Sequence, residues 1–348
     1  MILNTLQLAR WWELMSESLD RTLVVGGAGY VGSVLVKRLL REGNCVTVLD
    51  NLLYNNDLSL HDVIDHPKLT FINGDLRNID DFSRSLTGIR NVVLLAALVG
   101  DPISKKYPDM AHSVNEEGAI ALINNLNGKG IDKFVFLSTC SNYGLQDTDE
   151  LTTETAELKP LSVYAKNKVA VEEYLLSQEQ NLDYCFTILR CATAFGTSGR
   201  MRFDLTVSEF CREFTINGSF LIYDEDTWRP YCHVEDICKA IITVLSAKSE
   251  LVNSEVFNVG SDSGNFTKKM VVEEILKHLP DAVAHYKEDG FDPRNYRVSF
   301  HKIQNTLGFS CDYKVEDVIP KLVFALSNGM FSDFEDRRNF YGNYEIII

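Results

Sequence analysis

The chain contains no long apolar run, no Cys-x-x-Cys pair and no stretch that resembles a leader sequence. None of its apolar runs approaches the ~20 residues that a transmembrane helix requires, so we expect no membrane span. Residues 1–19 are apolar but carry Arg10, Glu13 and Glu17, and they lack a basic start and a small-residue cleavage site. They are therefore not predicted to be a signal peptide, and residues 1–21 are interpreted as an N-terminal extension with a partly amphipathic helix.

Basic residues are in deficit, with 34 Lys and Arg against 49 Asp and Glu and a formal net charge of −15. Such an acidic chain is a poor partner for a nucleic-acid backbone, and a nucleotide ligand would need a locally basic pocket. The eight cysteines are expected to be free thiols in a reducing cytoplasm. No His, Cys or Asp cluster has the spacing of metal ligands, so we predict no metal.

A glycine-rich stretch from Thr22 to Gly32 is the strongest motif. The apolar run Leu23–Val25 ends in Gly26, and glycines recur at Gly29 and Gly32 before the helix-like segment Ser33–Arg41. Glycine allows a tight turn and a close approach to a pyrophosphate, and the following helix start offers N–H groups to the anion. This pattern predicts dinucleotide binding, with Tyr30 and Val31 between the last two glycines.

Carboxylates follow the next two predicted strands. The strand Cys45–Leu49 ends in Asp50, at the spacing where the dinucleotide fingerprint places an acid for the adenosine ribose. Asp50 would repel a 2′-phosphate, which favours NAD over NADP. Asp75 follows a short strand, Leu69–Ile72, and could reach the adenine amino group or cap a helix over residues 78–86, and both roles can hold at once.

Further along, a fully apolar run at residues 92–97 predicts a buried parallel strand, with small residues at Ala96 and Ala97 beneath a cofactor. A helix is predicted over residues 113–127, with Asn115 near its start. The strand from Phe134 opens into the hydroxyl-rich run Ser138–Gly144. Tyr164 and Lys168 stand four residues apart, on one face of a helix predicted over residues 161–178.

Taken together, these motifs resemble the extended short-chain dehydrogenase/reductase family, and within it the nucleotide-sugar epimerase/dehydratase group. The similarity covers residues 22 to about 310 in the family's order. Its later parts are Trp228-Arg229-Pro-Tyr231-Cys-His233-Val234-x-Asp236 and Phe257-Asn-Val-Gly260. The resemblance implies a Rossmann-type doubly wound parallel sheet (residues 22–190 and 230–262) and a smaller mixed C-terminal substrate lobe (191–229 and 263–348).

The resemblance also implies roles for individual residues. Tyr164 is expected to be the catalytic acid/base, Lys168 its partner and Thr139 the hydroxyl that orients the substrate. The expected contacts to NAD are Gly26, Gly29, Tyr30, Val31, Gly32, Asp50, Asn51, Asp75, Leu76, Ala96, Ala97, Asn115, Ser138, Tyr164 and Lys168. The expected contacts to the substrate are Ser141, Thr193, Arg202, Asp204, Leu205, Arg229 and Arg294, with Thr193 standing where many members have an Asn.

The implied reaction is hydride transfer at C4 of a nucleotide-diphosphate hexose or heptose, used for surface polysaccharides or deoxysugars. Family dehydratases carry Asp-Glu after the catalytic Thr, whereas this chain has Cys140 and Ser141, which disfavours a 4,6-dehydratase. Epimerase, dehydrogenase and 4-keto-sugar reductase activities stay open, as does a non-catalytic NAD-binding protein. Lys168 and oxidised nicotinamide are expected to lower the pKa of Tyr164 from its usual ~10.

Anion binding and assembly complete these expectations. The planar guanidinium suits a diphosphate, so Arg202, Arg229, Arg294 and Arg297 are the candidates to hold one. The alternative for each is a surface charge or an ion pair with Asp204, Glu235 or Asp292. His233 is expected to be structural. By analogy with the family, the helices over 113–127 and 161–178 would form a homodimer interface.

Overall fold

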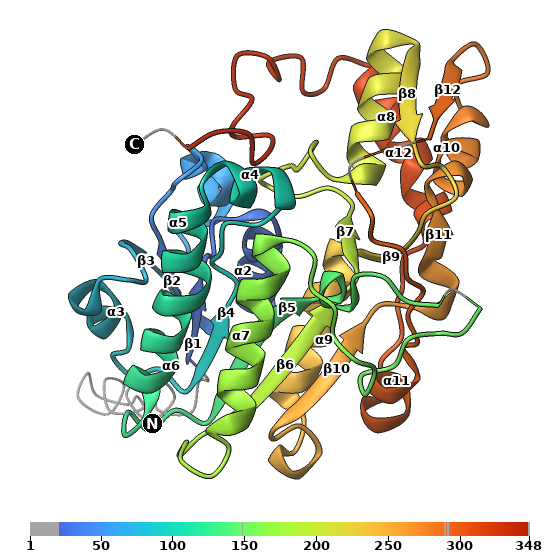
Figure 1. Ribbon diagram of the computed structural model, residues 1–348. Coiled ribbons are helices and arrows are strands. Elements are labelled where there is room, and N and C mark those ends of the chain that lie inside the picture. Colours follow the sequence, from blue (N-terminus) through green and yellow to red (C-terminus); the bar gives the residue numbers. More distant parts are fainter. Residues whose placement is uncertain (1–20, 148, 289, 291, 347–348) are drawn as a thin grey trace, which may run out of the picture.

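Seven parallel strands form the central sheet, in the order β10-β6-β5-β4-β1-β2-β3 (Figure 1). The computed structural model describes residues 21–147, 149–288, 290 and 292–346. The strands are β1 (Arg21–Val25), β2 (Cys45–Asp50), β3 (Leu69–Asn73), β4 (Asn91–Leu94), β5 (Lys133–Thr139), β6 (Cys185–Cys191) and β10 (Glu255–Val259). The predicted Rossmann-type sheet is confirmed, and β10 returns to it from late in the chain.

The strands follow from nearly continuous apolar runs. Residues 23–25, 92–94 and 134–136 are fully buried, as a parallel sheet covered on both faces requires. At the end of β1, Val25 pairs with Leu49 of β2 on one side and with Leu94 of β4 on the other. The strand order reverses between these two neighbours. In open α/β sheets, ligands bind beyond the carboxyl ends of the strands at such a point.

Helices cover both faces of the sheet (Figure 1). Helices α2 (Tyr30–Arg41) and α9 (Val234–Ser246) pack on one face with Val24 and Val93. On the other face lie α4 (Asp101–Lys106), α5 (Pro108–His112), the π-helical turn η2 (Ser113–Gly118), α6 (Ala119–Leu126) and α7 (Val163–Ser177). Short helices η1 (Asp57–Val63) and α3 (Ile79–Ser85) follow β2 and β3.

A smaller lobe packs around its own core beside the carboxyl ends of the strands. It contains α8 (Thr206–Asn217), β8 (Ser219–Tyr223), α10 (Lys268–Leu276), β12 (Val283–Lys287) and α12 (Val315–Ser327). A three-stranded sheet of β7 (Thr193–Phe195), β9 (Trp228–His233) and β11 (Asn265–Thr267) has parallel and antiparallel pairs. The remaining helices are η3 (Cys140–Tyr143), η4 (Ser249–Leu251), η5 (Asp262–Gly264) and α11 (His301–Leu307). The predicted small mixed lobe is confirmed.

Beyond α12, the chain leaves this lobe and runs back to the sheet domain (Figure 1, dark red). Asn343 Nδ2 donates to the carbonyl of Val99 (2.7 Å), Glu345 pairs with Lys106 (2.7 Å), and Ile346 is buried with the core beside α4. Residues 344–346 have no regular secondary structure. Residues 347–348 and the extension over residues 1–20 lie outside the described residues.

All eight cysteines are free thiols. Within residues 21–346, as far as they are described, no helix has the length and apolar character needed to cross a bilayer.

Candidate active site

A cavity of about 1330 Å³ opens at the carboxyl ends of β1, β4 and β5, between the sheet domain and the small lobe. Sites for one small molecule usually measure about 300–1,000 Å³, so this cavity can hold two ligands side by side. Every predicted catalytic, cofactor and substrate residue lines it except Asn115 and the diphosphate candidate Arg297. Motifs that are dispersed over some 270 residues of sequence therefore share one cavity.

The glycine turn forms one wall. Gly26 has φ +87°, and a Cβ there would lie 2.6 Å from the backbone N of Ala96. A Cβ on Gly32 would lie 2.2 Å from the carbonyl oxygen of Gly26. Both positions therefore require glycine. Helix α2 begins at Tyr30, and its N-cap Gly29 supplies no side-chain cap, so the first N–H groups face the cavity that a diphosphate would enter.

The carboxylate of Asp50 lies beside this turn at the end of β2. It accepts hydrogen bonds from the backbone N–H groups of Ala28 and Leu52, both at 2.9 Å. Burial raises the pKa of Asp50, and these two N–H groups oppose that shift by stabilising the carboxylate. A fixed carboxylate at this position fits the ribose-binding role that the sequence predicts, and the wall as a whole fits a dinucleotide.

Two neighbouring predictions need correction. Asp75 lines the cavity and pairs with Arg77 (2.7 Å), whose hydrogen bond lowers the pKa of Asp75. It does not cap α3, because Asn78 is the N-cap and accepts from the N–H groups of residues 80 and 81. Asn115 is buried behind the cavity wall, where its side chain accepts from Leu98 N (2.7 Å) and donates to Leu98 O (3.1 Å). These two hydrogen bonds hold the loop after β4, and Asn115 is not among the residues that line the cavity.

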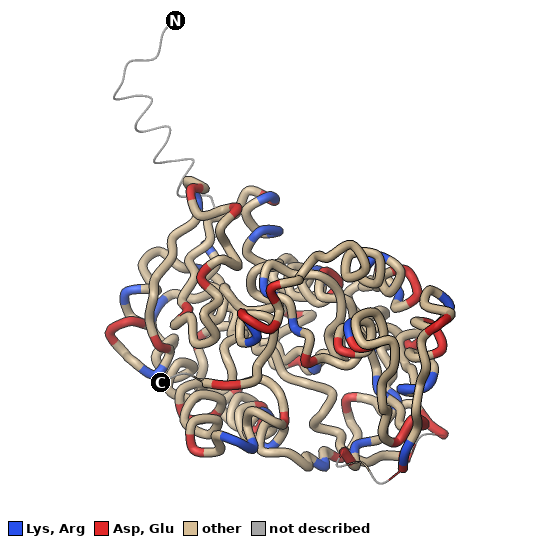
Figure 2. The backbone as a smooth tube through the Cα atoms, turned by 90° about the horizontal axis from the view of Figure 1, so that it is seen from above, with Lys and Arg blue, Asp and Glu red and all other residues tan. Residues whose placement is uncertain are grey.

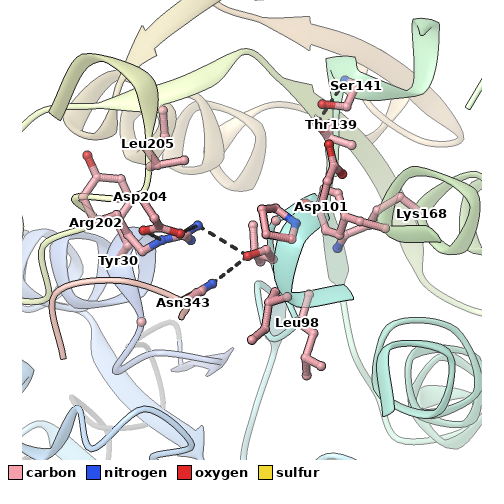
Figure 3. Close-up of a pocket in the computed structure, with 18 of the residues that line it drawn as sticks. Tyr30, Leu98, Asp101, Thr139, Ser141, Lys168, Arg202, Asp204, Leu205 and Asn343 are labelled. Carbon is pink, nitrogen blue, oxygen red and sulfur yellow. Dashed lines mark hydrogen bonds and ion pairs between the residues drawn. The ribbon is translucent and has the colours of Figure 1, made fainter. Parts of the chain in front are cut away.

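Thr139, Tyr164 and Lys168 meet on the opposite wall, and Figure 3 shows Thr139, Ser141 and Lys168 on the same side of the cavity. Thr139 ends β5, and its Oγ1 accepts from Ser141 N (3.1 Å), which leaves its own proton available to donate. Tyr164 and Lys168 lie in the first turns of α7, which begins at Val163 because Ser162 caps it. Lys168 Nζ donates to Leu137 O (2.8 Å) and lies 5.9 Å from the ring centroid of Tyr164.

Burial dominates the protonation of these groups. It raises the pKa of Tyr164, which the Asp101 carboxylate raises further, while Arg202 and Arg294 lower it. Without a bound cofactor, desolvation of the phenolate outweighs the nearby positive charges, and the lowering expected from Lys168 together with oxidised nicotinamide stays a prediction. Burial also lowers the pKa of Lys168 to about 8, which Glu172 opposes.

Three of the four predicted arginines, Arg202, Arg229 and Arg294, line the cavity, and each also pairs with an aspartate. Arg297 is not among the lining residues, and its guanidinium carbon lies 4.8 Å from the centroid of the Trp228 ring. Arg202 contacts Asp204 (2.6 Å), and Arg229 contacts Asp292 (2.9 Å). Arg294 lies 2.7 Å from Asp292 and 2.7 Å from Asp101, and it donates to Ser141 Oγ (3.1 Å). The ion pairs that the sequence offered as an alternative thus coexist with a place in the cavity wall. Thr193 and Leu205 line the same wall.

Four of the lining residues without a predicted role carry polar or charged side chains that matter below. Asp101 follows β4, Tyr54 follows β2, Arg200 follows β7, and Asn343 belongs to the chain end. In Figure 3, Arg202 and Asn343 converge on the backbone beside Asp101, where both donate to Val99 O. Arg200 stands two residues before Arg202, and the sequence Arg200-Met201-Arg202 alone gives no reason to assign the two arginines different roles.

The fold and this cavity define a dinucleotide-binding α/β enzyme of the Rossmann type. Comparison with known proteins then narrows the class. The model of the NAD-dependent epimerase/dehydratase family matches residues 22–260. The UDP-glucose 4-epimerase of Corynebacterium glutamicum is 30% identical over 312 residues, which cover 84% of this chain and 91% of that protein. The chain belongs to the NAD-dependent epimerase/dehydratase family, within the extended short-chain dehydrogenases/reductases, and its cofactor is NAD.

Solved structures show the same fold. DesIV, a dTDP-glucose 4,6-dehydratase from Streptomyces venezuelae with NAD and TYD bound, has a TM-score of 0.80 and 25% identity, covering 91% of this chain and 99% of that chain. The UDP-glucose 4-epimerase of Thermotoga maritima with UDP-glucose has a TM-score of 0.78 and 24% identity, covering 89% and 99%. The likeness therefore extends over nearly the whole of each structure.

Proposed function

We propose that this enzyme oxidises C4 of a nucleotide-diphosphate hexose or heptose and returns the hydride to the opposite face, as a 4-epimerase does. The observation that carries the proposal is the meeting of Thr139, Tyr164 and Lys168 in one cavity with the glycine turn. The similarity to UDP-glucose 4-epimerases supports it. A protein that only binds NAD would have no use for a phenol, an ammonium and a hydroxyl at this end of the cavity.

In this mechanism Tyr164 acts as a phenolate and takes the proton of the C4 hydroxyl. The hydroxyl of Thr139 orients that group, since its own acceptor position is already used by Ser141 N. Lys168, fixed by Leu137 O, places a positive charge near Tyr164 that favours the phenolate before it takes the proton. When bound, NAD would supply a nicotinamide ring that can take up a hydride and return it. Because burial raises the pKa of Tyr164 in the protein alone, the phenolate must gain its stability from the filled site.

The end of β5 favours this reaction over a 4,6-dehydration. Cys140 is buried, and its thiol donates to Arg190 O (3.2 Å), away from the cavity. Ser141 faces the cavity and bonds to Arg294. Neither residue supplies the carboxylic acid or carboxylate that elimination of water needs.

Arg229 and Arg294 are proposed to bind the substrate diphosphate. They share Asp292, whose pKa their charges and hydrogen bonds hold well below its usual value despite its burial. A diphosphate offers more charge and more acceptor oxygens than this one carboxylate, and guanidinium groups bind it in a bidentate manner.

The test is Tyr164→Phe in the full-length chain, incubated with UDP-, dTDP-, GDP- and CDP-sugars. We expect the wild type to interconvert C4 epimers of one sugar nucleotide without net change in NADH, and Tyr164→Phe to lose this turnover while it still binds NAD. Tyr143→Phe is the matched control, because the Tyr143 phenol is buried, bonds to Asn258 and lies outside the cavity lining. Full turnover in Tyr164→Phe would refute the mechanism, and steady consumption of NADH would assign a ketoreductase instead.

We also propose a homodimer through α6 and α7, which lie next to each other on one face of the sheet (Figure 1). Leu176, in the last turn of α7, exposes a large apolar side chain. Sedimentation velocity that gives twice the 39.3 kDa chain mass would support the dimer, and a monomer at micromolar concentration would refute it.

A further inference from the structure

Arg200 is a buried cation without a carboxylate among its hydrogen-bond partners. Its side chain is 3% exposed, and Nη2 donates to Asn339 O (3.1 Å), Gly342 O (3.0 Å) and Asn343 Oδ1 (2.7 Å). Among the described residues, its Nε has no hydrogen-bond partner. Arg202, two residues on, is neutralised by Asp204. Buried charges are normally paired through hydrogen bonds. The carboxylates of Asp204 and Asp50 favour the charged form of Arg200 but are not among its hydrogen-bond partners, so its Nε points to an added anion.

Tyr54 adds a second unsatisfied group at the same place. The guanidinium carbon of Arg200 lies 4.6 Å from the centroid of the Tyr54 ring, and both side chains line the cavity. The Tyr54 hydroxyl is buried and has no partner within the described part of the chain. Burial also lowers the pKa of Arg200 to about 10, which reports the cost of a charge held out of water. A phosphate oxygen can accept from both groups.

The position of Arg200 identifies which anion this is. Ser198 Oγ donates to Tyr30 O (2.7 Å) and accepts from Arg200 N (3.2 Å), so the segment with Arg200 is tied to the first turn of α2. Arg200 acts electrostatically on Asp50, at the ribose end of the cavity, whereas Arg202 acts on Tyr164, at the catalytic end. Through Ser198, Arg200 lies beside the N-terminus of α2, where a bound dinucleotide has its diphosphate.

We propose that Arg200 and Tyr54 form a second wall of the cofactor diphosphate site, facing the N-terminus of α2, and that residues 339–343 hold Arg200 in place. The three oxygens of this segment fix the guanidinium through Nη2 and leave Nε for the phosphate. The end of the chain thereby becomes part of the cofactor site. The inference rests on NAD binding alone and is independent of which sugar the enzyme turns over.

Calorimetric titration of the full-length chain with NAD, ADP-ribose and adenosine tests the proposal. Arg200→Gln should weaken NAD and ADP-ribose by about 30- to 100-fold, the usual worth of a charge-assisted hydrogen bond, and leave adenosine unchanged. Tyr54→Phe, which removes only the hydroxyl, should weaken both diphosphates by about 5-fold. Because Tyr54→Phe is the smaller change, it still tests the proposal if Arg200→Gln does not fold. An equal loss for adenosine, or no loss for any ligand, would overturn the proposal.

The role of the chain end is tested separately. Asn343→Ala removes one acceptor of Arg200 and should weaken NAD and ADP-ribose by about 5-fold without affecting adenosine. Arg338→Ala is the matched control. This exposed side chain directly precedes residues 339–343, and its guanidinium carbon lies 4.6 Å from the centroid of the Tyr344 ring. If Asn343→Ala binds both diphosphates like the wild type while Arg200→Gln does not, the chain end has no part in the site.

Discussion

His233 illustrates how burial fixes the protonation of a single side chain. Its Nδ1 accepts from Glu235 N (3.3 Å) at the start of α9, and its ring stacks on Tyr313 with centroids 4.2 Å apart. The expected structural role is consistent with this capping. Burial, with a smaller contribution from Lys321, lowers the pKa of His233 to about 4. The unfolded chain, with an ordinary pKa near ~6.5, therefore binds this proton more readily than the folded protein.

The stability that depends on neutral His233 is therefore complete above pH ~6.5 and is lost as the pH falls toward the folded value. At pH 5 the loss amounts to about 2 kcal/mol. His233→Asn retains a capping side chain and cannot titrate, so its urea unfolding should lose about 2 kcal/mol less than the wild type between pH 7 and pH 5. Parallel pH profiles for the two proteins would contradict this assignment.

Asp101 affects the proposed base directly. Its charge raises the pKa of Tyr164, and it pairs with Arg294, whose charge lowers that pKa. Asp101→Asn removes the first effect and frees the second, so both changes lower the pKa of Tyr164. We expect the limb of the pH profile of kcat/KM that reports the base to move to lower pH, as measured from steady-state rates between pH 6 and pH 10. Lys105→Gln, on the same helix, is the control that should leave this limb in place. An unmoved limb in Asp101→Asn would show that the Asp101 carboxylate does not influence the pKa of Tyr164.

At the same scale, the sequence identified those site residues whose roles depend on local spacing. Gly26 and Asp50 belong to the first strand-turn-helix-strand unit, where binding a dinucleotide restricts the residue types at fixed intervals. Tyr164 stands at a fixed spacing from Lys168 at the start of α7. Asp101 and Arg200 were missed because their roles arise between distant segments. The partners of Arg200 lie 139 to 143 residues further along the chain, and no local pattern marks them.

Among the elements, α7 depends most on a buried polar network. Glu172 and Arg190 form an ion pair at 2.7 Å with side chains 1% and 5% exposed, and Ser138 and Asn142 donate to the same carboxylate. This pair joins α7, which carries Tyr164 and Lys168, to β5 and β6. A buried pair contributes little net stability when intact but costs about 3–5 kcal/mol when one partner is removed, because the other charge stays buried.

Arg190→Met should therefore lower the free energy of unfolding by about 3–5 kcal/mol, measured by urea denaturation. The double variant Arg190→Met with Glu172→Met removes both charges and should recover much of that loss. The exposed pair Arg90–Asp132 (2.6 Å) is the comparison, since Arg90→Met should change stability by less than about 1 kcal/mol. A double variant that is less stable than Arg190→Met would show that the network stabilises α7 beyond its charges.

The elements themselves were predictable to different degrees. The buried strands follow from apolar runs, so β1, β2, β4 and β5 lie within a few residues of their predicted positions. The helical stretch predicted from Ser113 starts earlier, at Pro108, because proline suits a first helical turn. The π-helical turn at 113–118 has no sequence signal of its own, since the bonds of Asn115 to Leu98 form only in the folded protein.

At the scale of the whole molecule, charge is distributed unevenly between the surface and the cavity. The chain has a net charge of −15, with acidic and basic residues interspersed over both lobes (Figure 2). Among the described residues, nine basic and seven acidic side chains line the cavity. Burial and neighbouring carboxylates also raise the pKa of one of the acids, Glu209, to about 7. The locally basic pocket that a nucleotide would need in this acidic chain is present.

The negative charge of the whole molecule and the basic side chains of the cavity act on a ligand over different distances, which predicts an unusual salt dependence. At 10 mM salt the Debye length is about 30 Å, so an approaching anion feels the repulsion of the entire acidic molecule. At 150 mM it is about 8 Å, and only the cavity charges act on the ligand. We therefore expect association rates for NAD and for sugar nucleotides to rise by about 2- to 10-fold between these conditions, measured by stopped-flow fluorescence. Adenosine, which is uncharged, should show no change, and rates for NAD that fall with salt would mean that the cavity steers its ligands from far outside its mouth.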